Sequence, residues 1–276
     1  MADIYAETMP RHKDEVERIN QQFDLVAKNM GYILHPSIEL SSSPRIADIG
    51  TGTARFIFRL YSKIPDAIWE GFDISSALFP DEDTLPPNVS LSVLDIKQPF
   101  PEHMHEKYDL VQARLLTAAM QPGDWEPTIR NIFRILKPGG YLQWTEPEIP
   151  NIEWLKTTPN SKVQASKYIG DKFFNSYADT TFGWNALPAQ MQAAGYSSVI
   201  RDVKKSDTIP ETRRDMTHII ANLCLSWVRM KTERGASEPP FGDCLDSLEK
   251  EVDQEIESGC YVRFNIHDVC GQKPLM

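Results

Sequence analysis

The clearest pattern of hydrophobic and polar positions in the chain lies between Pro44 and Leu60. Apolar residues lead up to Ile49, two glycines follow at Gly50 and Gly52, and apolar positions then return with helical spacing. This order predicts a strand, a tight turn and an amphipathic helix. Glycines let a backbone pass close to a ligand, and the first amides of a helix point their hydrogens into the same space. We therefore expect a nucleotide-like cofactor at this turn.

The strand before the glycine turn carries an acid, Asp48, near its end. Two further short apolar segments predict strands that end in an acid, one at Asp73 and the other at Asp95. A single acid in such a place is usually a helix cap or a solvated side chain. The carboxyl ends of parallel strands, however, meet at the edge where open α/β sheets bind ligands, so we expect Asp48, Asp73 and Asp95 to lie close together. Asp73 follows Gly52 by 21 positions (73 − 52), a separation suited to binding ribose hydroxyls.

The remaining patterns extend this alternation of strands and helices. They predict helices at 9–35, 161–195, 210–233 and 244–257, a helix from 129 that ends at a Lys-Pro-Gly-Gly turn (137–140), and strands at 108–116, 141–146, 195–203 and 261–269. We divide the chain into an N-terminal helical lid (1–40), a cofactor-binding core (41–150) and a region of inserted helices and last strands (151–276). The last region belongs to the same structural domain as the core.

The glycine turn resembles motif I of class I S-adenosylmethionine (SAM) methyltransferases, through an acid, two glycines and a small residue at alternate positions, here Asp48, Gly50, Gly52 and Ala54. Ala54 departs from the glycine that is more frequent in the family. A dinucleotide fingerprint would need a glycine where Arg55 stands, which disfavours NAD or FAD. The resemblance covers residues 45–146. It implies an α/β fold with a seven-stranded, doubly wound, Rossmann-like sheet, capped by N-terminal and inserted helices.

The same resemblance implies that SAM is the cofactor and S-adenosylhomocysteine the product. In the family, the first acid faces the ammonium of the methionine part and the second binds the ribose hydroxyls. The third acid accepts a hydrogen bond from the adenine amine, and the apolar residue after it packs on the ring. The cofactor-binding residues implied in this chain are Tyr5, Asp48, Gly50, Thr51, Gly52, Asp73, Ile74, Asp95, Ile96, Gln112, Ala113 and Arg114.

The methyl acceptor is expected on the far side of the cofactor, under the inserted helices. The helix within 9–35 is either ordinary packing or a lid over the crevice. Aromatic residues between 161 and 195 form either core or the wall of an apolar acceptor pocket. Trp144 and Glu146 end the fifth strand and should border the acceptor. The expected substrate-binding residues are Arg18, Gln22, Trp144, Glu146 and Phe174.

Composition narrows the classes of partner. The 276-residue chain has a formal net charge of −10 and a pI near 5.1, which disfavours a surface that follows nucleic-acid phosphates. Without a leader or a long apolar stretch, the protein is expected to be cytoplasmic and away from the membrane. We also expect a monomer that acts on a small-molecule acceptor. Four cysteines without a C-x-x-C pair, and an H-x-H at His103 and His105 without a third ligand, predict no metal site.

No general base stands out in the sequence. His218 and His267 come late enough to reach an acceptor, but each is more often structural. Gln112-Ala113-Arg114 occupies the place of the N/D-P-P-Y motif of amine methyltransferases that act on DNA adenine or glutamine.

The leading helix and the following M-G-Y-I-L-H-P segment resemble fungal secondary-metabolite methyltransferases. Within that group the whole chain is most similar to enzymes that S-methylate the thiols of gliotoxin-type epidithiodiketopiperazines. The alternatives are an O- or N-methyltransferase of another secondary metabolite and a methyltransferase-like regulatory scaffold. An NAD oxidoreductase is the most distant alternative, because of Arg55.

Overall fold

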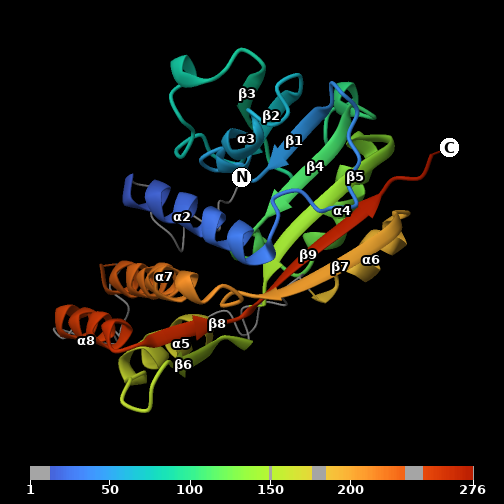
Figure 1. Ribbon diagram of the computed structural model, residues 1–276. Coiled ribbons are helices and arrows are strands. Elements are labelled where there is room, and N and C mark those ends of the chain that lie inside the picture. Colours follow the sequence, from blue (N-terminus) through green and yellow to red (C-terminus); the bar gives the residue numbers. More distant parts are fainter. Residues whose placement is uncertain (1–12, 149–150, 176–184, 234–244, 276) are drawn as a thin grey trace.

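Seven strands form one twisted sheet in the order β3-β2-β1-β4-β5-β9-β7 in the computed structural model (Figure 1). The structure describes residues 13–148, 151–175, 185–233 and 245–275. The pairs from β3 to β5 are parallel, and β9 is antiparallel to both β5 and β7. The strands of this sheet are β1 (Arg45–Ile49), β2 (Ile68–Asp73), β3 (Val89–Val93), β4 (Tyr108–Arg114), β5 (Leu136–Pro147), β7 (Ser197–Lys205) and β9 (Asn265–Gln272). The predicted α/β fold is confirmed.

Successive strand residues point to opposite faces of the sheet. Apolar side chains therefore lie on both faces, and helices cover both. Ile46 packs in an apolar cluster with α2 (Lys13–Met30) and α3 (Arg55–Leu60). Its neighbour Ala47 belongs to the cluster on the other face, formed with α4 (Trp125–Ile135) and α6 (Leu187–Ala194). Short 3-10 helices in the connections span Glu82–Thr84, Glu102–Met104, Thr117–Ala119 and Pro210–Thr212.

A second group of elements lies beyond the carboxyl ends of the parallel strands (Figure 1). It consists of α5 (Gln164–Asn175), α7 (Arg213–Glu233), α8 (Leu245–Glu257) and a two-stranded sheet of β6 (Glu153–Lys156) and β8 (Cys260–Arg263). We call this group the cap. α2 contributes Val26 and Met30 to the apolar cluster of the cap, and Phe23 and Ala27 to the cluster against the main sheet. One helix therefore joins the apolar cluster of the cap to the cluster on one face of the main sheet.

Two predicted elements differ from the structure. The single strand expected at 261–269 is divided, because β8 pairs with β6 whereas β9 joins the main sheet. Phe264, at the division, is buried; its carbonyl accepts a hydrogen bond from the Ser206 amide at 2.9 Å, and its amide donates to the Ser206 hydroxyl at 3.1 Å. The expected Lys-Pro-Gly-Gly turn lies instead in an irregular start of β5. A Cβ at Gly140 would approach the Tyr108 carbonyl to 2.9 Å, so glycine is needed for this close approach.

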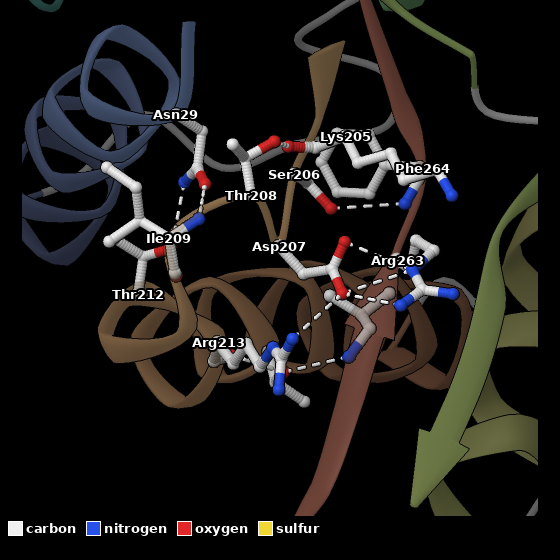
Figure 2. A network of polar contacts seen from close by, with 12 residues as sticks. Asn29, Lys205, Ser206, Asp207, Thr208, Ile209, Thr212, Arg213, Arg263 and Phe264 are labelled. Atoms are coloured by element: carbon white, nitrogen blue, oxygen red, sulfur yellow. Dashed lines mark hydrogen bonds and ion pairs between the residues drawn. The ribbon is translucent and has the colours of Figure 1, made fainter. Parts of the chain in front are cut away.

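The carboxyl end of α2 is held by a buried polar network (Figure 2). The Asn29 amide donates to the Thr212 hydroxyl at 2.8 Å and accepts from the Ile209 amide at 2.9 Å. Asn29 is 3% exposed, so these bonds are shielded from water. The segment before α7 thus fixes the end of α2.

The same network continues to the junction of β8 and β9 (Figure 2). Asp207 is buried and accepts a bidentate pair of hydrogen bonds from Arg263 at 2.8–3.0 Å. Arg213 lies 3.5 Å from the same carboxylate. Two guanidiniums on one buried carboxylate balance its charge and connect α7 to β8.

Candidate functional site

The turn after β1 has a backbone that few side chains would allow. Gly50 and Gly52 adopt φ of 66° and 50°. A Cβ on Gly50 would overlap the Leu116 side chain, whereas one on Gly52 would meet open space. Ala54 shares the left-handed conformation, with φ 57°, which is uncommon outside glycine. The positive φ at all three positions explains the small residues of the motif.

Asp48, at the end of β1, is buried below this turn. Its Oδ2 accepts a hydrogen bond from the Thr51 hydroxyl at 2.6 Å. Burial raises the pKa of Asp48 to about 7, although the Thr51 bond and the charge of Arg114 pull it down. The carboxyl is thus poised between its neutral and charged forms near neutral pH.

Asp73 and Asp95 hold the two adjacent strand ends in place. Asp73 accepts from the Gly52 amide at 2.9 Å and from the Ser75 amide at 3.2 Å. Asp95 accepts from the Lys97 amide at 3.0 Å. Asp95 keeps further lone pairs for a ligand, since a carboxylate offers about four acceptor sites.

One cavity of about 240 Å³ brings the three acids together. It opens between the glycine turn, α2, the ends of β2 to β4, and the cap residues Phe173 and Leu223. The predicted cofactor or substrate residues that line it are Arg18, Gln22, Asp48, Gly50, Thr51, Gly52, Asp73, Ile74, Asp95, Ile96 and Arg114.

Other predicted site residues do not line this cavity. Gln112 and Ala113 are buried within β4, and Phe174 packs edge-to-face on Phe173. Trp144 and Glu146 are also fully buried, and point to the α4 face of the sheet. Tyr5 lies outside the described residues.

Glu146 acts on the cavity indirectly, through the turn after β4. Its carboxylate accepts from the Trp144 indole at 2.7 Å, from the Leu116 amide at 2.8 Å and from the Thr117 hydroxyl at 2.7 Å. Leu116 and Thr117 themselves line the cavity. The structure therefore places Glu146 behind the cavity wall.

Several cavity residues did not emerge from the sequence. Leu115–Met120 line the cavity directly after β4, a position that the strand-end rule could have indicated. Phe23 and Leu223 belong to ordinary apolar stripes of α2 and α7, so no sequence signal separates them from core residues. The aromatic residues between 161 and 195 are expected to form either core or the wall of a pocket. Phe173 fits both, because it is buried and also lines the cavity.

α2 lies across the glycine turn and is bonded to it. The Thr53 hydroxyl bonds to the Asn20 amide oxygen at 2.7 Å, and Asp24 forms ion pairs with Arg55 and Arg59. The Asp24 pairs are about one-third exposed or more, so we assign them a small share of the stability.

Arg114, the last residue of β4, has an unusual environment. Its guanidinium stacks on the Phe23 ring at 4.3 Å. Nε and Nη1 are buried without a hydrogen-bond partner within the described part of the chain. Burial lowers the pKa of Arg114, and the charges of Asp268 and Asp48 oppose that shift.

The late histidines lie away from the cavity. His267 is buried, with Nε2 3.0 Å from Glu148 and Nδ1 bonded to Arg201, and burial lowers its pKa. His218 does not line the cavity either. Among residues 13–148, 151–175, 185–233 and 245–275, no cluster of three or more metal-ligating side chains occurs. In the same ranges no helix has the length and apolar character needed to cross a membrane.

The residues of the cavity fit SAM. Glycines leave room against the backbone, three acids lie at the ends of adjacent strands, and Arg114, with two guanidinium nitrogens unpartnered within the described residues, lines the same cavity as Asp48. An adenosyl group with an amino-acid end requires a binding surface of this kind, with acids for hydroxyl, amine and ammonium groups and a cation for the carboxylate.

Comparison with known proteins agrees with this geometry. A family described as "Methyltransferase domain" matches residues 46–140. Methyltransferase grgD of a Penicillium species is 35% identical over 160 residues, 55% of each chain, so the match spans about half of that relative. N-methyltransferase gliN of Aspergillus fumigatus is 24% identical over 279 residues, 94% of each chain.

Solved structures share the fold. A complex of the Haloferax volcanii Trm112 methyltransferase activator with a methyltransferase contains a chain that superposes with a TM-score of 0.56, at 16% identity and 99% coverage of both chains. The sequence relatives and the matched domain agree with the resemblance seen at the glycine turn. Residues 46–140 match a methyltransferase domain, and the chain as a whole is similar to the class I, SAM-dependent methyltransferases of fungal secondary metabolism.

Proposed function

We propose that the protein transfers a methyl group from SAM to a nitrogen atom of a small secondary metabolite. The observation that carries the proposal is one continuous cavity that is lined both by the strand-end acids and by apolar cap residues. Relatives named N-methyltransferases that align over almost the whole chain support nitrogen as the acceptor. The net charge of −10 also favours a small molecule over nucleic acid.

At the cofactor end, we assign roles by strand. Asp73 binds the ribose hydroxyls, Asp95 accepts from the adenine amine, and Ile96 packs on the ring. Asp48 faces the ammonium of the methionine part, and Gly50 and Gly52 allow the backbone to approach it. We place S-adenosylhomocysteine, the product, in the same contacts.

At the acceptor end, the protein mainly aligns the nucleophile and excludes water. SAM supplies an electrophilic methyl group on a sulfonium. We assign this end to Phe173, Leu223 and Pro147, which are apolar residues of the cavity lining. The described acceptor-side lining contains no carboxylate or imidazole, so an amine that attacks as the free base suits it.

S-methylation of a dithiol of the gliotoxin type is the second candidate. The same lack of a base on the acceptor side supports it, since a thiol with a pKa of about 8.5 ionises far more easily than a phenol near 10. The relatives named N-methyltransferases favour nitrogen over this alternative.

Two measurements test the proposal. Calorimetry should detect micromolar or tighter binding of S-adenosylhomocysteine and none of NADH; a protein that binds neither is the regulatory scaffold. Incubation with SAM and a panel of diketopiperazine amides, free amines, reduced dithiols and phenols should then give a mass gain of one methyl group on nitrogen. Methylation of the dithiols alone would show that the acceptor atom is sulfur and not nitrogen.

A further inference from the structure

We propose that Arg114 is an anion receptor of the cavity, which binds a carboxylate or a similar planar oxyanion through its guanidinium. The proposal rests on the proposed function, because the anion belongs to one of the two ligands of that cavity. Two molecules can deliver the carboxylate: the methionine part of the cofactor, or the methyl acceptor.

The first argument is the unmatched hydrogen-bonding capacity of Arg114. Arg18 and Arg55 also line the cavity, and each has a carboxylate partner, Glu15 and Asp24 respectively. Nε and Nη1 of Arg114 have none in the described ranges, although both atoms are buried. Buried donors without an acceptor are costly, and they are therefore satisfied in the functional state by water or by a ligand.

The second argument concerns charge. Asp268 and Asp48 are the acids that act most strongly on Arg114. Asp268, however, accepts its hydrogen bonds from Gln143 and Thr145, and Asp48 accepts from Thr51. Burial also raises the pKa of both acids toward the neutral form. The charge of Arg114 is thus only partly balanced, which leaves room for a ligand anion.

The third argument is geometric. The ring of Phe23 lies 4.3 Å from the guanidinium carbon and supports one face of the guanidinium. A planar guanidinium with adjacent N–H groups matches the two oxygens of a carboxylate. Arg114 ends β4, between the glycine turn after β1 and the end of β5 at Pro147. This place borders both the amino-acid end of the cofactor and the acceptor.

The cofactor arm of the test compares two ligands by calorimetry. S-adenosylhomocysteine carries the carboxylate and 5′-methylthioadenosine lacks the whole amino-acid end. If the cofactor supplies the anion, Arg114→Gln should weaken S-adenosylhomocysteine binding roughly 10- to 100-fold and leave methylthioadenosine within about twofold. Arg114→Lys should recover part of the loss, since it restores charge without the planar pair of donors.

The acceptor arm uses protein saturated with S-adenosylhomocysteine. Indole-3-acetate and its uncharged amide are the probes, because their aromatic bodies suit the apolar acceptor end. If the acceptor supplies the anion, the wild type should prefer the acid and Arg114→Gln should lose that preference, with its affinity for S-adenosylhomocysteine unchanged.

Controls separate the outcomes. Arg59→Gln makes the same chemical change on α3, outside the cavity lining, and should leave both arms unchanged. If Arg114→Gln does not fold, Phe23→Leu keeps the arginine but removes its stacking partner, and should weaken the same arm. A folded Arg114→Gln protein that binds the ligands of both arms as the wild type does would contradict the proposal that Arg114 is an anion receptor. A wild type that does not bind S-adenosylhomocysteine would instead overturn the proposed function.

Discussion

Asp48 shows how one buried residue can couple ligand binding to protonation. Its carboxyl is 5% exposed, and desolvation outweighs the hydrogen bond from Thr51 in setting its pKa. In the folded protein the pKa is about 7, against an ordinary value of 3.8. The folded state therefore binds this proton more tightly than the unfolded chain does. An ammonium placed beside Asp48 would favour the charged form and displace the proton.

The raised pKa predicts a stability that falls with pH. The contribution of protonated Asp48 is complete below about pH 4 and is lost as the pH rises through about 7. Between pH 5 and 8, the wild type should lose stability relative to Asp48→Asn, which imitates the neutral form, by at most about 1.4 kcal/mol per pH unit. Urea unfolding of both proteins across this range measures the difference. Parallel pH profiles would contradict the shift.

Asp73 gives a prediction for cofactor binding. Asp73→Ala should weaken S-adenosylhomocysteine binding by roughly 1–3 kcal/mol, the cost of leaving hydrogen bonds to a charged group unmade. Because Asp73 also accepts from the Gly52 amide, thermal unfolding without ligand should accompany the calorimetry. Asp66→Ala, on an exposed loop before β2, is the matched control and should bind normally. An unchanged affinity of Asp73→Ala would show that the ribose lies elsewhere.

Strand alternation explains which site residues the sequence could identify. Asp48, Asp73 and Asp95 end strands or directly follow them, so topology alone places them at one edge. Trp144 and Glu146 also lie near a strand end, but their side chains point to the α4 face. The sequence shows where a strand ends, whereas the orientation of a side chain depends on register against its neighbours.

At the scale of elements, α2 connects the parts that enclose the cavity. Its middle section is bonded to the glycine turn through Asn20 and Asp24, whereas its carboxyl end is fixed by buried bonds of Asn29. The sequence predicted this helix from its apolar spacing. Its partners could not be predicted, because Thr212 and Ile209 lie about 180 positions further along the chain.

The Asn29 bonds predict a stability effect. Asn29→Ala should lower the free energy of unfolding by roughly 1–3 kcal/mol, since the Ile209 amide and the buried Thr212 hydroxyl each lose a partner. Urea denaturation followed by circular dichroism measures the change. Asn222→Ala, at an exposed position of α7, should stay within about 0.5 kcal/mol of the wild type. If Asn29→Ala lowers the free energy of unfolding no more than the control does, Asn29 does not fix the end of α2.

At the scale of the whole molecule, the core of the cap and the core on one face of the main sheet meet along α2. Phe23 and Ala27 pack against the main sheet, while Val26 and Met30 pack against the cap. The cavity likewise has walls from both parts. The sheet order could be expected from the sequence resemblance, but the joint packing of sheet and cap depends on contacts between distant segments. Ligand binding should therefore stabilise the main sheet and the cap together.

This coupling predicts the pattern of hydrogen exchange. A hundredfold excess of S-adenosylhomocysteine over its Kd should stabilise the folded protein by about 2.7 kcal/mol. Amides of β1 and β4 and those of α7 should gain protection together, because α2 belongs to both cores. Exchange followed by mass spectrometry resolves these peptides. Under Asn29→Ala the gain in α7 should shrink while that in β1 persists, since the hydrogen bonds between α2 and the segment before α7 are lost. Protection confined to the main sheet in the wild type would mean that the cap responds independently of the cofactor.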